Sequence, residues 1–208
     1  MDRFLLGATI AMAIVVLASN ILVQFLFGNW LTWGAFTYPF AFLVTDLVNR
    51  LRGPAAARRV VYAGFATGLV CSLVGTQIIG EFGPLVSPRV AIASLTAFLV
   101  GQLMDVTVFN RLRQGSWWRA PLVASVLGSV LDTVIFFSLA FSATLSFIAT
   151  NVDVGWANEI VPLLGQGPAA PLWISLALAD FSVKLAIAVF ALMPFRIAIW
   201  QYQPRAQK

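Results

Sequence analysis

Five ionisable side chains stand inside long apolar stretches of this 208-residue chain and are its first candidates for chemistry. They are Asp46, Asp105, Asp132, Asp180 and Lys184. A charge at the centre of a bilayer is costly, so such residues face a protein interior or a wet cavity and mark a binding site or an ion path. Buried carboxylates can accept N–H donors from a ligand or carry a proton.

Two of these residues are four positions apart. At this spacing Asp180 and Lys184 share one helix face, with the acid nearer the N-terminus, which is the favourable order for an ion pair. The pair has two interpretations, a neutralised structural contact or part of a ligand site. Asp132, within GSVLDTVIFF, has no partner at helical spacing, and we expect it to have a functional role.

The other two acids precede one repeated tetrapeptide. Asp46 is followed by Asn-Arg-Leu-Arg at 49–52, and Asp105 by the same four residues at 110–113. The match suggests an internal repeat of two parallel helices, an arrangement with which transporters build a site between two halves. Alternatively, the arginines only anchor two helix ends in lipid headgroups.

Uncharged polar side chains accompany the acids in the same stretches. They are Asn20, Thr45, Asn49, Gln102 and Asn110. A carboxylate accepts two parallel N–H donors and an amide both donates and accepts, so together they suit the edge of a planar heterocycle. The alternative for each is a hydrogen bond to a neighbouring helix.

Aromatic residues precede Asp46 within one stretch. They are Trp33, Phe36, Tyr38 and Phe40. Flat rings can stack on a flat ligand, although packing against helices or lipid is the alternative for each. Pro39 lies among them and is predicted to kink or loosen the helix, because it has no backbone N–H. The freed backbone groups need partners in the protein or in a cavity, so this helix should form a wall of the site.

The sequence lacks the residues of several other chemistries. It has no histidine, which excludes imidazole relays and His-ligated zinc, and it has no GxxxxGK[ST] motif. The single Cys71 cannot form an intramolecular disulfide. The residues flanking the acids do not match an intramembrane aspartyl protease. We therefore expect no enzyme, no metal and no cofactor.

The elements that must position these residues are membrane-spanning helices. The chain is 60% hydrophobic and only 10% charged, far from the composition of a soluble domain. Six apolar runs are long enough to cross a bilayer, at 4–27, 30–51, 59–80, 89–110, 119–148 and 170–195. The first run is expected to be retained rather than cleaved, and the fifth to become a surface segment after about Phe141. The sequence predicts an all-α integral membrane protein, a single six-helix domain over 1–208.

The basic residues predict the orientation of these helices. Eleven of them lie before the first run, after the second and the sixth, or between the fourth and the fifth: Arg3, Arg50, Arg52, Arg58, Arg59, Arg111, Arg113, Arg119, Arg196, Arg205 and Lys208. The other two loops contain Arg89 as their only basic residue. Because cytoplasmic loops are rich in Lys and Arg, both termini should be cytoplasmic. The net charge of +5 then reflects topology and lipid headgroups, and nucleic acid is not an expected partner.

Longer segments, in order along the chain, resemble the queuosine precursor transporter family, also called the vitamin uptake transporter family. The matching segments are SNILVQ at 19–24, TWGAFTYPFAFLVTDLVNRLRG at 32–53, ARRVVYA at 57–63, RVAIASLTAFLVGQLMDVTVFNRLRQ at 89–114, WWRAPLVASVLGSVLDTVIFFSLAF at 117–141 and ADFSVKL at 179–185. They touch all six runs. The segment 142–170 matches least. It is either an outer gate or only a loop.

The resemblance implies a multi-pass transporter of the bacterial inner membrane that imports 7-cyano-7-deazaguanine or 7-aminomethyl-7-deazaguanine. It supports as recurring polar positions Asn20, Thr45, Asp46, Gln102, Asp105, Asn110, Asp132, Asp180 and Lys184. A 7-deazaguanine presents N1–H and a 2-amino group to one carboxylate, with Asp46 and Asp132 as candidates. Its O6 needs a donor, for which Asn20, Gln102 and Lys184 are candidates.

Two other functions remain open from the sequence. One is a substrate-binding membrane subunit that needs a separate ATPase, for which Gly7-x-x-x-Ala11 offers a close-packing surface to a partner or, in a homodimer, to a second copy. The other is a structural membrane protein whose acids only bond neighbouring helices. The preferred precursor and the coupling ion are not visible in the sequence.

Overall fold

The computed structural model describes residues 2–81, 83–149 and 151–202. Its α-helices are α1 (Arg3–Leu22), α2 (Gly34–Thr37), α3 (Phe40–Arg52), α4 (Pro54–Gln77), α5 (Pro88–Leu112), α6 (Arg119–Phe141) and α7 (Leu172–Tyr202). Three antiparallel strand pairs join them: β1 (Leu26–Phe27) with β2 (Leu31–Thr32), β3 (Ile79–Gly80) with β4 (Gly83–Pro84), and β5 (Ile160–Pro162) with β6 (Ala169–Pro171). Short 3₁₀ turns cover Ala143–Ile148, Trp156–Asn158 and Leu163–Gly165.

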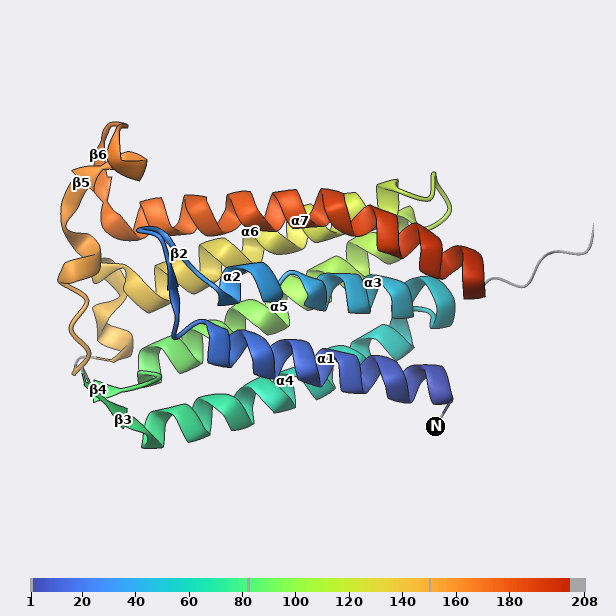
Figure 1. Ribbon diagram of the computed structural model, residues 1–208, viewed down its shortest axis with the longest axis horizontal. Helices are drawn as coiled ribbons and strands as arrows, with labels where there is room; N and C mark the ends of the chain where they lie inside the picture. The colour runs from blue at the N-terminus through green and yellow to red at the C-terminus, as the bar shows by residue number, and fades with distance from the viewer. Residues whose placement is uncertain (1, 82, 150, 203–208) are drawn as a thin grey trace, which may run out of the picture.

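The long helices lie side by side along one axis and form an elongated bundle (Figure 1). The strand pairs gather at one end, which we call the hairpin end. The start of α1 and the end of α7 lie at the opposite end, which we call the termini end. Because successive long helices alternate in direction, α3 and α5 both run toward the termini end, as expected for the repeated tetrapeptides.

Proline divides the second apolar run, as its sequence predicts. α2 and α3 are separate helices with Tyr38 and Pro39 between them. The Ala41 N–H bonds to the Tyr38 carbonyl at 3.0 Å and the Phe42 N–H to the Pro39 carbonyl at 3.1 Å, which is a tighter turn than an α-helix makes. The apolar run predicted over 30–51 is therefore a helix broken at the proline, as Pro39 predicted.

The predicted end of the first run was wrong. α1 ends at Leu22, and the chain then folds back so that Leu26 pairs with Thr32 and Phe27 with Leu31. Gly28 takes a positive φ of 65° in this turn, a conformation that glycine adopts without steric cost. The prediction for the fifth run is confirmed, because α6 ends at Phe141 and a 3₁₀ segment follows.

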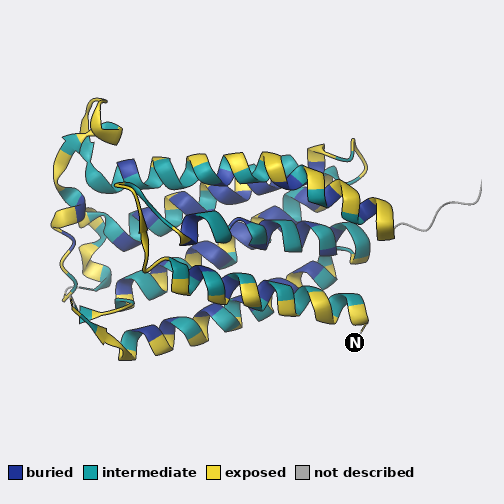
Figure 2. Ribbon diagram, viewed as in Figure 1, coloured by how far each residue is buried: buried dark blue, intermediate teal, exposed yellow. Residues whose placement is uncertain are grey.

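Exposed residues lie along the outer faces of the long helices, and the interior holds apolar and polar side chains together (Figure 2). Many large apolar side chains on the outward faces are exposed, among them Ile14, Val70 and Met193 at 60%, 60% and 65%. Charged and amide side chains lie inside instead. Five of the described helices, α1, α4, α5, α6 and α7, are long and apolar enough to cross a membrane. Together they fit an all-α membrane protein whose outer surface contacts lipid.

Two glycines let α5 and α6 approach closely at the level of the buried acids. A methyl group on Gly101 would come within 3.0 Å of the Asp132 Cβ and of the Gly128 carbonyl. A methyl group on Gly128 would come within 2.8 Å of the Phe42 ring and 3.3 Å of the Asp105 Cβ. The absence of side chains here lets Asp132 of α6 pack beside Gly101 and Asp105 of α5 pack beside Gly128.

Candidate functional site

A large cavity of about 520 Å³ extends from the hairpin end toward the middle of the bundle. Its walls come from α1, α2, α4, α5, α6 and α7 and from the β1–β2 turn, and they are mostly apolar. Aromatic side chains on these walls include Trp30, Phe98, Phe136 and Trp156. Five of the candidate residues line it: Asn20, Tyr38, Asp132, Asp180 and Lys184.

Lys184 is the centre of a buried ionic cluster at this cavity. Its ammonium lies 2.6 Å from the Asp132 carboxylate and 2.6 Å from the Asp180 carboxylate, and it donates to the Thr133 hydroxyl at 3.1 Å. These partners use its three N–H donors. The Lys184 and Asp132 side chains are 4% exposed and that of Asp180 is 15% exposed. The cluster carries a net charge of about −1, because two carboxylates face one ammonium.

The predicted pair of Asp180 and Lys184 is present, and Asp132 joins it from another helix. The second oxygen of Asp132 accepts a hydrogen bond from the Tyr38 hydroxyl at 2.7 Å. The Tyr38 ring also lies 5.3 Å from the Lys184 ammonium, within the range of a cation–π contact. Tyr38 comes from the break between α2 and α3, so the proline break places this phenol among the charges.

A second polar cluster lies deeper in the bundle, toward the termini end. Asp46 on α3 accepts a hydrogen bond from the Ser125 hydroxyl on α6 at 3.1 Å. Asp105 on α5 lies next to α6, where a carbon added to Gly128 would be 3.3 Å from its Cβ, but neither of its carboxyl oxygens has a hydrogen-bond partner in the described chain. Asp46 and Asp105 are 2% and 0% exposed. These two carboxyls do not line the large cavity.

Amide and hydroxyl groups tie α3 to α5 around this second cluster. Thr45 donates to the Gln102 side-chain carbonyl at 2.6 Å, and the Asn49 amide donates to the Val106 main-chain carbonyl at 3.0 Å. Thr45, Asn49 and Gln102 are completely buried and line neither cavity. The structure therefore places them as contacts between helices.

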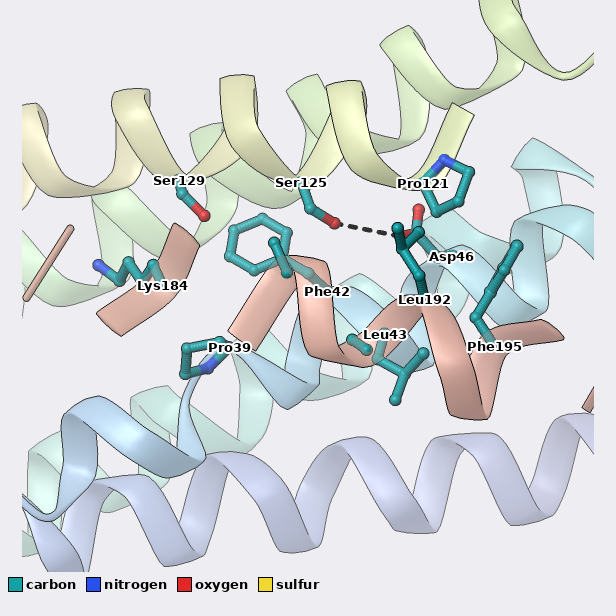
Figure 3. Close-up of a pocket in the computed structure, with 12 residues that line it drawn as sticks. Pro39, Phe42, Leu43, Asp46, Pro121, Ser125, Ser129, Lys184, Leu192 and Phe195 are labelled. Atoms are coloured by element: carbon teal, nitrogen blue, oxygen red, sulfur yellow. Dashed lines mark hydrogen bonds between the residues drawn. The ribbon is translucent and has the colours of Figure 1, made fainter. Parts of the chain in front are cut away.

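A small cavity of about 10 Å³ connects the surroundings of the two clusters (Figure 3). It lies between α3, α6 and α7, with Lys184 at one end and Asp46 at the other. Ser125 and Ser129 of α6 line it between them. A cavity of this size has room for about one water molecule.

Other candidates lie away from both cavities. Trp33 and Phe36 form an aromatic group with Phe27 at the hairpin end, with ring centroids 4.9 to 5.9 Å apart. Phe40 lines neither cavity, and Asn110 is exposed near the termini end. The two tetrapeptides thus have different surroundings, since Asn49 is buried. The internal repeat stays a prediction.

Some functional positions were missed from the sequence. Ser125 and Ser129 lie near polar groups only because α6 packs against α3 and α7. Trp30, which was not among the candidates, lines the large cavity. Arg89 was assigned to an outer loop, but it lies within α5, is 0% exposed and donates to the Leu139 and Ser142 carbonyls at the end of α6. Serine and tryptophan are too common in spans for sequence to single these out.

This arrangement can bind a flat, polar molecule and hold its polar edge at a charged cluster. The site is concave, mostly apolar and has few convergent polar groups, as ligand sites generally do. Asp180 is the most exposed acid of the cluster, and its Oδ1 accepts no hydrogen bond from the described part of the chain. The Asn20 amide lies on the opposite wall and uses one of its donors on the Val16 carbonyl.

Comparison with known proteins agrees with this architecture. The chain is similar over residues 32–199 to the family described as "Putative vitamin uptake transporter". It is 35% identical to the "Queuosine precursor transporter" of Escherichia coli K12, over 87% of this chain and 79% of that protein. It is 35% identical to the "Probable queuosine precursor transporter" of Haemophilus influenzae, over 78% and 66% of the two chains. A Bacillus subtilis protein, "Probable queuosine precursor transporter", is 27% identical over 88% of this chain and 77% of its own.

No solved structure matches this chain. The family match covers most of the apolar runs and both polar clusters, and it describes transporters rather than enzymes. With its exposed apolar helices, the chain is a multi-pass protein of the bacterial inner membrane. It belongs to the vitamin uptake transporter family.

Proposed function

We propose that this protein imports the queuosine precursors 7-cyano-7-deazaguanine and 7-aminomethyl-7-deazaguanine through the large cavity. The observation that carries the proposal is the ionic cluster at the inner end of a cavity of about 520 Å³. Sites for small molecules commonly have volumes of about 300 to 1,000 Å³. The names of the similar proteins supply the substrate class.

Asp180 is the carboxylate best placed for the guanine-like edge. N1–H and the 2-amino group of the ligand point in parallel and suit one carboxylate. Each oxygen of Asp132 already accepts a bond from Tyr38 or Lys184. Asp180 keeps one oxygen, Oδ1, which can accept one of these two donors, and Asp180 is the more exposed of the two acids. In this proposal Asp132 positions Tyr38 and Lys184 rather than contacting the base directly.

Asn20 is the donor proposed for the O6 atom. Lys184 has no donor left, because Asp132, Asp180 and Thr133 use all three. Gln102 is remote from the cavity. Adenine has an amino group in place of O6 and no N1–H, so binding it leaves buried donors and acceptors unpaired. That mismatch costs about 1 to 3 kcal/mol for each group.

The walls of the cavity suit the faces of a flat base. Tyr38, Phe136 and Trp156 line it from three different segments. Trp156 belongs to the stretch 142–170 and contacts Phe141 edge to face, with ring centroids 5.5 Å apart. We therefore assign this stretch the role of an outer gate. Trp33 and Phe36, by contrast, pack with Phe27 and support the β1–β2 turn.

In this proposal the single domain crosses the membrane six times with both termini cytoplasmic. Five crossings are the long helices, and the remaining one, second along the chain, is α2 followed by α3. The 4 residues of α2, the 13 of α3 and the two between them extend about 28 Å. That is close to the hydrocarbon thickness of about 30 Å. Arg50, Arg113 and Arg196 lie toward the termini end, which supports its placement in the cytoplasm.

The experiment measures binding to the purified protein in detergent. Thermal unfolding is followed with 7-cyano-7-deazaguanine, 7-aminomethyl-7-deazaguanine, guanine and adenine, for the native chain, Asp180→Asn and Asn20→Ala. We expect the deazaguanines to raise the unfolding temperature of the native chain, because a ligand of the folded state stabilises it by mass action. Asp180→Asn should weaken affinity by about 10- to 100-fold, as expected for a lost charge-assisted bond of about 1.5 to 3 kcal/mol.

Asn110→Ala is the matched control, since Asn110 is a candidate that lies outside both cavities. Equal affinity of native, Asp180→Asn and Asn20→Ala chains would contradict the proposed site. If substitution of the acids changes the stability of the protein but never its affinity for a ligand, the acids have only a structural role. Uptake into liposomes by the purified chain alone distinguishes an importer from a subunit that needs an ATPase.

A further inference from the structure

The deep polar cluster contains two carboxyls that face one another. Asp46 comes from α3 and Asp105 from α5; Ser125 of α6 donates to Asp46 at 3.1 Å, and a carbon added to Gly128, three residues further along α6, would lie 3.3 Å from the Asp105 Cβ. Both are at least 98% buried. The proposed substrate site does not use them, because neither lines the large cavity.

The pair lacks the partners that two ionised carboxylates require. Asp46 Oδ1 and both oxygens of Asp105 are buried without a hydrogen-bond partner in the described chain. Neither acid takes part in any ion pair among the described residues. The side-chain nitrogen of Gln102, three residues before Asp105, is also buried without an acceptor. Unpaired buried charges of this kind are strongly unfavourable.

The charged groups on the surrounding helices are engaged elsewhere. Lys184 of α7 lines the small cavity with Asp46, but Asp132 and Asp180 hold its ammonium. Arg50 of α3 and Arg113, just after α5, donate to each other's main-chain carbonyls. The basic residues of α4 and the one beginning α6 are exposed: Arg58, Arg59 and Arg119.

Two ionised carboxylates close together at this burial are strongly unfavourable, and one proton shared between them removes the conflict. We propose that Asp46 and Asp105 together bind one proton and that this proton is the coupling ion for import. The loaded pair has a net charge of −1 and the unloaded pair −2, so each cycle takes up one proton and releases one. The coupling depends on the transport proposed above, whereas the proton site does not.

The geometry favours a proton over a metal cation. The cavity next to Asp46 has a volume of only about 10 Å³, which leaves space for about one water molecule. A shared proton needs no additional volume.

The small cavity also gives the pair a connection to the substrate. Lys184 lines both cavities, and Ser129 and Ser125 continue from it toward Asp46 (Figure 3). Hydroxyl groups and one water can relay a proton over such a path. A ligand at Asp180 therefore changes the hydrogen bonding at one end of this path while the proton occupies the other end.

The proton site is tested first without any substrate. Infrared spectra of the purified full chain in lipid are recorded across a pH series for the native protein, Asp46→Asn, Asp105→Asn and Glu159→Gln. We expect a protonated-carboxyl C=O band that persists at neutral pH in the native chain and in Glu159→Gln, whose carboxyl is exposed. The band should be lost or shifted in both Asn variants. Its absence from the native chain, or its persistence unchanged in both Asn variants, overturns the proposal.

The coupling is tested by uptake of labelled 7-cyano-7-deazaguanine into liposomes. An inward proton gradient should raise uptake by native protein and Glu159→Gln several-fold over no gradient, and this ratio should fall to about one in Asp105→Asn. Stimulation by a sodium gradient alone, or an undiminished ratio in Asp105→Asn, overturns the coupling. If the native chain takes up no precursor, the transport proposal fails, and the infrared result still decides whether the pair binds a proton.

Discussion

The ammonium of Lys184 on α7 lies 2.6 Å from the carboxylate of Asp132 on α6. The same ammonium also holds Asp180, one turn earlier on its own helix, at 2.6 Å. A single cation thus joins two helices at the inner end of the large cavity. Removing the cation leaves two buried carboxylates facing each other.

Replacing Lys184 should strongly destabilise the protein. Breaking a buried ion pair by removing one partner costs about 3 to 5 kcal/mol, and Lys184→Met leaves two acids unpaired. We expect a clear fall in the thermal unfolding temperature in detergent. The double variant Asp132→Asn/Lys184→Met should recover part of the loss, since it removes one of the uncompensated charges. A single variant as stable as the native chain would contradict a structural role for the cluster.

The close approach of α5 and α6 should not tolerate a larger side chain at its centre. Gly128→Val places carbon atoms against Phe42, the Gly101 carbonyl and Asp105, all within 3.3 Å of the first added carbon. Overpacking of this kind costs about 1 to 3 kcal/mol. Thermal unfolding with Gly7→Val as the control checks this, because an added carbon at Gly7 meets nothing within 4 Å. Equal losses in both variants would contradict the prediction.

Gly7→Val also tests for a second copy of the chain. If α1 pairs through Gly7 and Ala11, the valine should reduce the dimer measured by light scattering without lowering the unfolding temperature of the monomer. An unchanged mass would show that this face contacts lipid only.

Arg50 and Arg113 should contribute to stability jointly rather than separately. The Arg50 guanidinium donates to the Arg113 carbonyl at 2.6 Å, and Arg113 donates back to the Arg50 carbonyl at 3.2 Å. Cations near a helix C-terminus also stabilise the helix through a favourable interaction with its dipole. Each Met variant should lose about 1 kcal/mol, and the double variant less than the sum, because the two bonds are coupled. Arg58→Met, at an exposed site of α4, is the control; additive losses at 50 and 113 would contradict coupling.

The pair of Asp2 and Arg52 should make a small, pH-dependent contribution. The hydrogen bond from Arg52, at 2.6 Å, and then that from the Phe4 N–H lower the pKa of Asp2 below its ordinary value. A carboxyl with a lowered folded-state pKa contributes stability above its unfolded pKa and loses it as the pH falls through the folded one.

The difference in unfolding temperature between native and Asp2→Asn chains should therefore be constant above about pH 5 and shrink below about pH 4. High salt should reduce it at every pH, because both side chains are exposed. A difference that grows on acidification would contradict this assignment.

The sequence by itself determined the class of the protein and the list of unusual residues. Twenty-residue apolar runs have few alternatives to membrane helices, and a charge within them is costly wherever it lies. Local rules also predicted the break at Pro39 and the contact between Asp180 and Lys184, because both depend on neighbours within one helix turn.

Only the tertiary structure divided the polar residues into two clusters. Asp132 meets Lys184 of α7, and Asp46 meets Ser125 of α6, although many residues separate these partners along the chain. Helical periodicity says which face a residue occupies but not which helix stands opposite. For the same reason the sequence did not show which tryptophan reaches the cavity. Trp33, a candidate, is exposed, whereas Trp30 in the β1–β2 turn lines the cavity.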